Sequence, residues 1–224
     1  MAIRVAAASV LALTLLGAPH GAAAGNQSQI RRPPFAVSVA PLDAATRRLM
    51  TGRSWRPGCP VPLRDLRMIH MPYWGFDDRW HRGELVIHRR YAASVVRVFE
   101  KLYDARFPIR RMRLVDRYGA DDHRSMAADN TSGFNCRWRG GVCCTWSQHA
   151  YGRAIDLNPV ENPYLWSGGV SPPAGRAYLD RSRHRPGMVH AHDRVWWAFH
   201  AVGWGWGGTW SSEKDYQHFS ANGR

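Results

Sequence analysis

The sequence predicts an α+β fold in which helices flank a small antiparallel sheet. Residues 90–106 have the apolar spacing of an amphipathic helix. Several short apolar segments are separated by turn residues, as strands are, and the sequence has no internal repeat, coiled coil or low-complexity tract. Two main helices among several short strands are typical of the α+β class. With 224 residues, the chain is long enough for one domain with its own core.

Residues 1–24 have the pattern of a signal peptide. Arg4 gives a short basic start, and residues 5–16 form an apolar run that is too short to span a bilayer comfortably. Small residues at 22–24 fit a cleavage site, so we expect an exported chain that begins at Gly25. A retained membrane anchor is less favoured because the run is short. No later stretch is apolar enough for a span, so we expect no stable membrane insertion.

We expect an extended N-terminal lead-in at residues 25–54 and the main domain at 55–224. The lead-in is rich in Pro, Arg and small residues, with one short helix at 43–50. The first elements of the main domain are a strand at 85–88, a helix at 90–106 and a strand at 109–115. Pro108 ends the helix because proline disfavours helical geometry in the residue before it. Alternating apolar and basic residues at 109–115 are typical of a half-buried strand.

The second half of the chain predicts further short elements. They are a short helix or turn at 121–128, strands at 134–138 and 154–157, a loop-rich stretch at 158–185, and final strands at 206–210 and 216–219. A helix is predicted at 194–202 because Asp193 is a good N-cap and Gly203 can end the helix.

The chain is strongly basic, with 31 Lys and Arg against 17 Asp and Glu and a formal charge of +14 at pH 7. Loss of the signal peptide removes only Arg4 from this count. An exported cation should associate with anionic polymers, of which a cell wall rich in carboxylates and phosphates is the obvious one. Nucleic acid is the rival partner. We expect no nucleic-acid binding, because an exported protein rarely meets nucleic acid and the arginines form no dense run. We expect a monomer.

Four cysteines, Cys59, Cys136, Cys143 and Cys144, allow three disulfide pairings, and the sequence does not choose among them. Export makes disulfides plausible. We favour a Cys59–Cys136 bridge because it would tie the N-terminal segment to the segment before His149. The adjacent Cys143 and Cys144 are close to His149, and a structural or free-thiol role is favoured over metal binding.

Two short motifs carry the candidate chemistry. In the first, His149 is followed by Gly152 and by Asp156, which lies in an apolar strand where an unpaired carboxylate would be costly. In the second, Asp215 precedes His218. Two imidazoles and one carboxylate make a three-ligand zinc set with a fourth position open for water. The remaining acid, Asp215, could then take a proton from that water.

The pattern Ser-x-His-x-x-Gly-x-Ala-x-Asp at 147–156, a Trp/Gly-rich segment and Asp-x-x-His at 215–218 resemble a known family. They resemble the zinc D-alanyl-D-alanine carboxypeptidases and L-alanyl-D-glutamate endopeptidases of bacterial cell-wall peptides. Segments 130–137, 155–164 and 203–210 look like the secreted, VanY-like actinobacterial branch. The resemblance covers roughly residues 55–220, and the joined motifs are more specific than any one pattern. It implies the Hedgehog/D-Ala-D-Ala peptidase-like fold.

The resemblance implies that His149, Asp156 and His218 bind one Zn²⁺ per chain. It also implies that Asp215 is the general base that activates the zinc-bound water and later protonates the leaving amine. The substrate would be a peptidoglycan peptide, and the protein would be secreted and associated with the cell wall.

An arginine near the zinc usually assists such enzymes by polarising the scissile carbonyl or holding a substrate carboxylate. Arg137 is the candidate and Arg124 the alternative. Ser147 could contact substrate or orient the site. The substrate groove could be walled by three aromatic residues, Trp204, Trp206 and Trp210, although core packing is the default role of a tryptophan in a small domain. The chain departs from the family pattern at the adjacent cysteines 143 and 144, which leaves a vicinal or an intermolecular disulfide open.

Three function hypotheses remain open. The first is a secreted zinc metallopeptidase of the D-Ala-D-Ala carboxypeptidase type. An L-Ala-D-Glu endopeptidase would use the same zinc set. The second is a non-catalytic, zinc-containing cell-wall-binding module on the same fold, which is less favoured because Asp215 and the full ligand set are present. A Ser-His-Asp hydrolase is the weakest, because no nucleophile-elbow motif surrounds Ser147.

Overall fold

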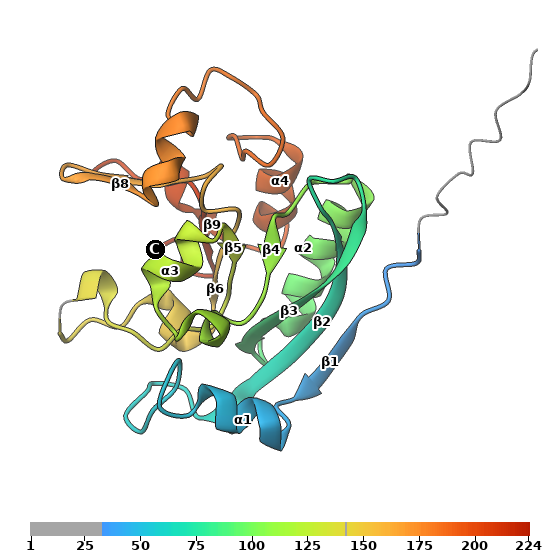
Figure 1. The fold of residues 1–224 in the computed structure, drawn as a ribbon, viewed down its shortest axis with the longest axis vertical. Coiled ribbons are helices and arrows are strands. Elements are labelled where there is room, and N and C mark those ends of the chain that lie inside the picture. The colour runs from blue at the N-terminus through green and yellow to red at the C-terminus, as the bar shows by residue number, and fades with distance from the viewer. Residues whose placement is uncertain (1–32, 142) are drawn as a thin grey trace, which may run out of the picture. The chain divides into compact units, whose positions relative to one another are not determined.

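The computed structural model, which describes residues 33–141 and 143–224, has an α+β architecture with small antiparallel sheets and flanking helices, as predicted (Figure 1). The predicted signal peptide and residues 25–32 of the predicted lead-in lie outside the described residues. Residues 34–224 form one compact unit. In the described part of the chain, no helix combines the length and the apolar character that a membrane crossing requires.

The longest strands form an antiparallel sheet in the N-terminal half. It has the order β1 (Ser38–Pro41), β2 (Leu66–Trp74), β3 (Trp80–His88). Helix α2 (Ala92–Asp104) packs along this sheet (Figure 1). Its buried residues, Ala92, Val95, Val98, Phe99, Leu102 and Tyr103, recur at helical spacing and join the main core cluster. Backbone hydrogen bonds from His88 to Gly152 and from Phe134 to Val86 join this sheet to the segments around the candidate site.

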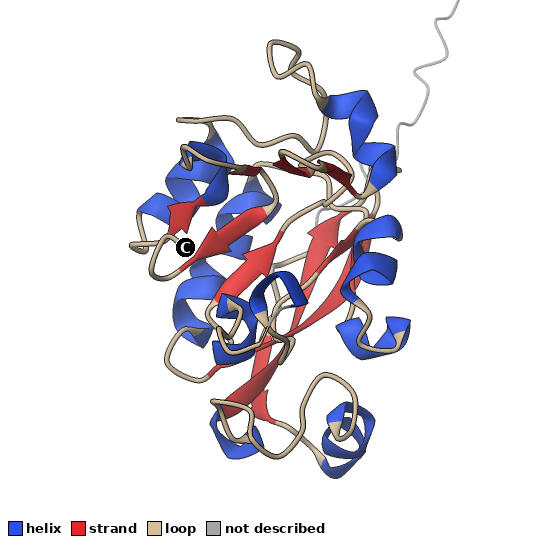
Figure 2. Cartoon of the chain, turned by 90° about the vertical axis from the view of Figure 1, so that its left-hand side faces the viewer, coloured by secondary structure: helices blue, strands red, loops and turns tan. Residues whose placement is uncertain are grey.

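A second antiparallel sheet carries candidate site residues. It has the order β6 (Ala154–Asp156), β11 (His218–Ser220), β9 (Gly205–Trp206). Its residues Ile155 and Phe219 are fully buried. Helix α4 (Arg194–His200) contacts α2, and its Phe199 ring stacks on Phe219 at 3.8 Å between centroids. Helices lie on both sides of the strands (Figure 2), so the sheet is anchored in the core.

Shorter elements complete the fold. A third antiparallel sheet has the order β10 (Lys214–Asp215), β7 (Tyr164–Trp166), β8 (Gly169–Ser171), and β4 (Arg111–Met112) pairs in parallel with β5 (Asn130–Thr131). The remaining α-helices are α1 (Ala44–Met50) and α3 (Asp122–Ala127). Aspartates cap α1, α3 and α4 by accepting a hydrogen bond from a backbone N–H of the first turn.

Two disulfides involve all four cysteines. Cys59 pairs with Cys136, as favoured from the sequence, and fixes the segment before β2 to the chain that leads toward His149. Cys143 and Cys144 form a vicinal disulfide, which was one of the alternatives that the sequence left open.

Several sequence expectations for strands are wrong. Residues 134–138 were expected to be a strand, but the segment is irregular apart from one bridge between Trp138 and Trp146. The strand expected at 109–115 is reduced to β4. The long strand β2 was not predicted. It is buried along most of its length, so it lacks the alternation of polar and apolar residues that marks a half-buried strand.

Candidate metal centre

Three side chains from distant parts of the chain meet at one buried point. His149 Nε2 lies 3.1 Å from Asp156 Oδ2, and His218 Nδ1 lies 3.0 Å from Asp156 Oδ1. The two facing ring nitrogens are 3.2 Å apart. The three residues are only 2%, 4% and 6% exposed. Within the described chain, they are the one group of His, Cys, Asp and Glu residues arranged closely enough to hold a metal ion.

A tight turn presents His149. The Ser147 hydroxyl accepts a hydrogen bond from the backbone N–H of His149 at 3.3 Å and caps the short 3₁₀ turn Gln148–Tyr151. Gly152 ends this turn with φ at +60°, a conformation that glycine adopts without steric cost. A Cβ at position 152 would lie 2.7 Å from the backbone nitrogen of His88. The glycine is therefore required both by the turn and by the close approach of β3.

Strand pairing places the other two side chains. Strands β6 and β11 are antiparallel, and their register sets Asp156 directly opposite His218. Directly opposed residues of an antiparallel pair project to the same face. Asp156 also bridges Ser132 on its other side through backbone hydrogen bonds. The carboxylate is thus fixed from both edges of a buried strand.

The outer nitrogen of each imidazole is held by a backbone carbonyl. His149 Nδ1 lies 2.6 Å from the Gly133 oxygen, and His218 Nε2 lies 3.1 Å from the Arg224 oxygen. A carbonyl only accepts hydrogen bonds, so each outer nitrogen must carry the proton. The inner nitrogens then present lone pairs toward each other and toward the Asp156 carboxylate. Such outer contacts commonly orient histidine ligands of metals.

This donor set fits a zinc ion. Three lone-pair donors facing one point repel one another unless a cation lies between them. Zinc bonds of about 2.0 to 2.1 Å at tetrahedral angles place neighbouring ligand atoms about 3.3 Å apart. The separations of 3.0, 3.1 and 3.2 Å among the side chains of His149, Asp156 and His218 are close to that spacing.

The electrostatics of the cluster also favour a positive charge. Burial would raise the pKa of Asp156, but the adjacent His149 and His218 outweigh it and hold this pKa well below its usual range. Burial would lower the pKa of His149, yet the Asp156 carboxylate raises it overall. The site therefore stabilises an anionic carboxylate and a cation next to it.

Asp215 is the second acid of the motif and lies on β10. Its Oδ1 is buried and has no hydrogen-bond partner in the described part of the chain. Burial raises its pKa to about 7, and the negative charge of Asp156 contributes to the increase. A Cβ at Gly207 would lie 2.8 Å from the Asp215 Cβ and 2.5 Å from its carbonyl oxygen. Gly207 thus permits the close approach that places Asp215.

Arg137 is part of this electrostatic neighbourhood. Its positive charge acts to lower the pKa of both His149 and Asp215. Its guanidinium pairs with Asp122 at 2.7 Å, and its Nε is buried without a partner among the described residues. Arg124, the alternative, has a side chain that is 77% exposed and pairs with Asp121 beside it on α3. The geometry favours Arg137 of the two.

Two of the three tryptophans that could have walled a substrate groove lie in the core instead. Trp204 and Trp206 are buried in the main core, and the Trp206 ring stacks near Phe219. Their side chains are therefore packing residues. Only Trp210 is close to a proposed ligand, with its ring 5.6 Å from that of His218. Ser147 is buried and acts as a cap, as described above.

Sequence reasoning missed several groups around the site. The carbonyls of Gly133 and Arg224 orient the two histidines, and a backbone acceptor leaves no signature in residue type. Asn135 was also missed; its backbone N–H bonds the His149 carbonyl, and its Nδ2 is buried without a partner among described residues. Asn135 lies in segment 130–137, which the sequence already singles out, and this is the signal that could have identified it.

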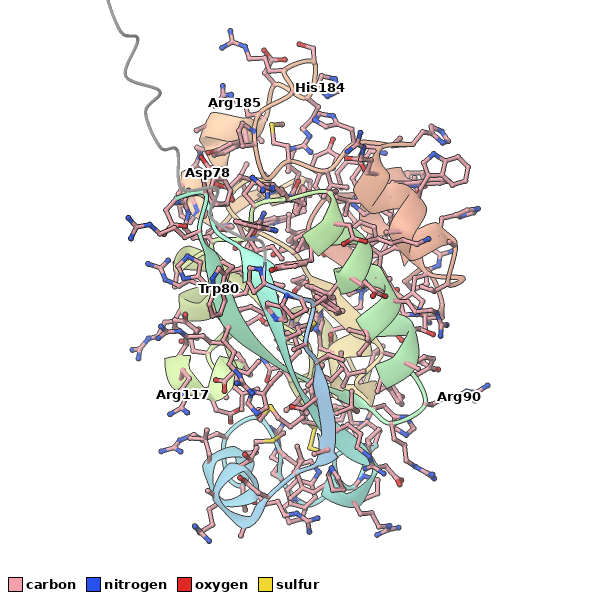
Figure 3. The ribbon with its side chains drawn as sticks, turned by 90° about the vertical axis from the view of Figure 1, so that its right-hand side faces the viewer. Asp78, Trp80, Arg90, Arg117, His184 and Arg185 are labelled. Carbon is pink, nitrogen blue, oxygen red and sulfur yellow. A yellow bond between two sulfur atoms is a disulfide. The ribbon has the colours of Figure 1, made fainter. Side chains whose placement is uncertain are left out.

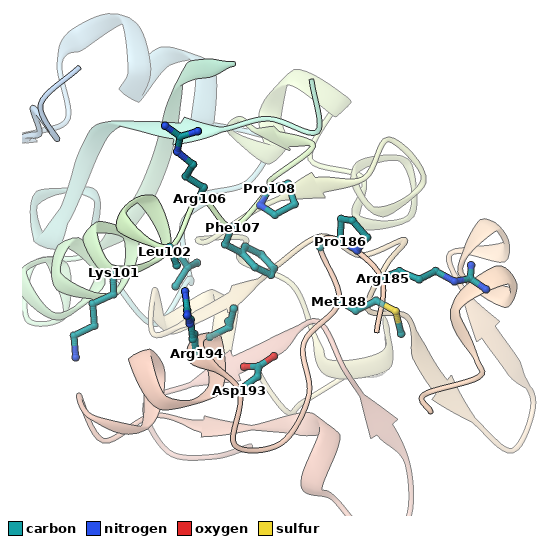
Figure 4. A pocket seen from close by; sticks show the side chains of 13 residues that line it. Lys101, Leu102, Arg106, Phe107, Pro108, Arg185, Pro186, Met188, Asp193 and Arg194 are labelled. Carbon is teal, nitrogen blue, oxygen red and sulfur yellow. The ribbon is translucent and has the colours of Figure 1, made fainter. Parts of the chain in front are cut away.

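A cavity of about 280 Å³ lies elsewhere, between the C-terminal end of α2 and the start of α4 (Figure 4). Leu102, Phe107 and Met188 are among its apolar lining residues. Arg106 and Arg185 belong to its lining, and the close-up shows their side chains extending in different directions rather than converging. None of its lining residues belongs to the metal cluster, so this cavity is separate from the chemistry described above.

Comparison with known proteins gives a family match in the C-terminal part of the chain. Residues 143–221 match the family model described as D-alanyl-D-alanine carboxypeptidase. The matched segment contains His149, Asp156, Asp215 and His218, and over residues 143–221 the match confirms the resemblance that the motifs indicate. It supports a peptidase. No curated protein and no solved structure matches the chain.

Proposed function

We propose that the protein is a secreted zinc metallopeptidase that hydrolyses an amide bond in peptidoglycan stem peptides, of the D-Ala-D-Ala carboxypeptidase type. One observation carries the proposal. The segment that matches the carboxypeptidase family supplies two imidazoles and a carboxylate that meet at one buried point, with a further acid, Asp215, three residues before His218.

The proposed ligands are His149, Asp156 and His218. A zinc ion held by three protein ligands supplies Lewis acidity, which polarises a carbonyl and makes water more acidic. The protein's own contribution is to aim the two inner nitrogens and the Asp156 carboxylate at one point. The carbonyls that hold the outer nitrogens support this role because they fix the tautomers.

Asp215 is the proposed proton carrier. Its Oδ1 has no hydrogen-bond partner in the described part of the chain, so a lone pair is free to accept a proton from the attacking water. The same carboxyl group would then deliver that proton to the nitrogen of the leaving amine, since departure as a neutral amine needs one. A carboxylate can serve in both steps because it returns to its starting form after each turnover.

Arg137 is the proposed substrate-positioning group. Guanidinium groups bind carboxylates and carbonyl oxygens through charge-assisted hydrogen bonds. The unpartnered Nε of Arg137 and its electrostatic influence on His149 and Asp215 support a position beside the substrate. It would hold the C-terminal carboxylate of the peptide or the carbonyl oxygen of the scissile amide.

Export and wall association complete the proposal. Both disulfides are consistent with an oxidising compartment. Arginines project into solvent on the face shown in Figure 3, among them Arg90 and Arg117. Without Arg4, 30 Lys and Arg against 17 Asp and Glu leave the mature protein with a formal charge of +13, which would draw it to anionic wall polymers.

The test is a mass-spectrometric digest of purified peptidoglycan by the mature protein, with and without a zinc chelator. The proposal predicts chelator-sensitive loss of one D-alanine from pentapeptide stems. Release of whole stem peptides would instead establish the endopeptidase. If the peptidoglycan is unchanged although each chain still binds one zinc, the protein is a non-catalytic binding module and not an enzyme.

A further inference from the structure

A shallow groove lies next to the strand that carries Asp215. Its volume is about 270 Å³, and it is lined by two segments that are distant in sequence, Leu165–Ser167 and Ser211–Lys214. The pairing of β7 with β10 brings these segments together, with Lys214 opposite Leu165 and Asp215 opposite Tyr164. The groove therefore lies beside the strand that carries Asp215, and its lining ends at Lys214, the residue before that acid.

An exposed aromatic ring dominates the groove. Trp166 is 41% exposed, whereas most tryptophans with a structural role are largely buried. It stacks with Tyr164, with 5.2 Å between ring centroids and 16° between planes. The turn after it packs against the indole so closely that a Cβ at Gly168 would lie 2.5 Å from Trp166 Nε1. The ring is thus held in place at the surface, and a ligand would lose little affinity to ordering it.

The charged groups of the groove are already engaged. The Glu213 carboxylate accepts hydrogen bonds from Arg139 at 2.8 Å and from the Tyr164 hydroxyl at 2.6 Å. The Lys214 ammonium donates to the carbonyl of Trp210. Although the protein as a whole is strongly basic, this groove presents no free cluster of cations. A neutral ligand suits it better than a polyanion.

Free hydroxyl groups surround the ring. Ser167, Ser211 and Ser212 are exposed groove residues, and in the part of the chain that the structure describes their hydroxyls have no hydrogen-bond partner. A hydroxyl both donates and accepts. An aromatic ring beside several free hydroxyls matches a sugar, which has an apolar C–H face and a rim of hydroxyl and amide groups.

We propose that this groove binds a saccharide ring of the glycan strand that carries the stem peptide. The inference rests on the proposed function, because it makes the sugar a second recognised part of the same substrate. Trp166 contacts the apolar face of the ring, and the serine hydroxyls bond its polar rim. The enzyme then recognises peptides attached to glycan in preference to free peptides.

The test is an NMR titration of the ¹⁵N-labelled mature protein with the peptide-free β-1,4-linked trimer of N-acetylglucosamine. The Trp166 indole signal is assigned by its absence from the spectrum of Trp166→Ala. We expect this signal to shift saturably. Trp197→Ala is the matched control, since Trp197 is 52% exposed on α4, outside the groove, and this variant should bind the trimer as the wild type does.

Affinity for the trimer should fall about tenfold in Trp166→Ala through loss of the aromatic contact. If Trp166→Ala does not fold, the double variant Ser211→Ala/Ser212→Ala should weaken binding instead. A Trp166 signal that does not move, or equal shifts of the Trp166 and Trp197 signals, would overturn the proposal. The titration does not depend on turnover, so it tests the saccharide site separately from the enzyme activity. If the protein binds the trimer but does not hydrolyse peptidoglycan, the saccharide site stands and the proposed function is rejected. If it hydrolyses peptidoglycan but does not bind the trimer, the proposed function stands and the saccharide site is rejected.

Discussion

Asp156 and His218 lie directly opposite each other on β6 and β11, with Asp156 Oδ1 3.0 Å from His218 Nδ1. The strand register alone fixes this pair, and the turn that carries His149 adds the third group. A cluster built on paired strands is more rigid than one built on loops, which suits a metal centre.

Removal of either histidine should release the metal. His149→Ala and His218→Ala each leave two of the three proposed ligands, so we expect zinc per chain to fall from about one to near zero after dialysis. Metal content is measured by atomic emission on the purified proteins. His192→Ala, a change at an exposed histidine outside the cluster, is the control. Full zinc occupancy in His149→Ala would mean that the ligand assignment is wrong.

Replacement of Gly152 by alanine should destabilise the protein and disturb the turn of His149. A left-handed conformation costs an alanine roughly 1 to 2 kcal/mol, and the new Cβ would also lie 2.7 Å from the His88 nitrogen. Gly119→Ala is the matched control, because its φ is +74° and nothing lies within 4 Å. Urea unfolding should show a clearly larger loss for Gly152→Ala. Equal losses of unfolding free energy in the two variants would show that the close contact with His88 adds no cost.

Replacement of Arg137 should lower activity more than replacement of Arg124. Loss of a charge-assisted contact to substrate costs on the order of a hundredfold in kcat/KM. Arg124→Ala should stay near the wild-type value because its side chain is 77% exposed and its guanidinium pairs with Asp121. Peptide hydrolysis kinetics, with thermal unfolding to confirm that both variants fold, give the comparison. A stronger effect of Arg124→Ala would reverse the assignment.

Stability should depend on pH through Glu161, which is buried next to Asp129. Burial, with the Asp129 carboxylate beside it, raises the pKa of Glu161 to about 8 from an ordinary 4.5, although Arg110 acts in the opposite direction. The folded protein therefore binds this proton more tightly than the unfolded chain does. The stability that the folded protein gains from protonated Glu161 is fully present below about pH 4.5 and is lost as the pH rises through about 8.

Glu161→Gln cannot ionise and should lack this dependence. The wild type should lose on the order of a few kcal/mol of unfolding free energy relative to Glu161→Gln between pH 5 and pH 9. Urea unfolding at several pH values measures the difference. Parallel pH curves for the two proteins would show that Glu161 does not titrate in this range.

Much of the helical structure could be predicted from the sequence. Helix α2 has a clear apolar stripe, and Asp43 and Asp193 cap α1 and α4, so period and caps locate these elements. Strand β2 could not be found in the same way, because its buried residues do not alternate with exposed ones. Strand pairing depends on contacts between distant segments, which local patterns do not encode.

The candidate site likewise contains groups that the sequence could identify and groups that it could not. The motif residues His149, Asp156 and His218 could be named in advance because residue type carries their chemistry. The carbonyl of Gly133 could not, since every residue has one. The sequence left Trp204 and Trp206 open between groove wall and core, because a tryptophan's position in the sequence does not tell which way its ring faces; both rings are buried in the core.

We propose that Asp215 moves the proton at a metal centre to which it is not itself a ligand. Zinc content and peptidoglycan hydrolysis, both measured on one preparation of Asp215→Asn, separate these two roles. Asparagine keeps the shape of the side chain but cannot act as a base. We expect about one zinc per chain and a rate lowered by about 10² to 10⁴. Near-wild-type hydrolysis by Asp215→Asn, with zinc bound, would show that Asp215 is not the base.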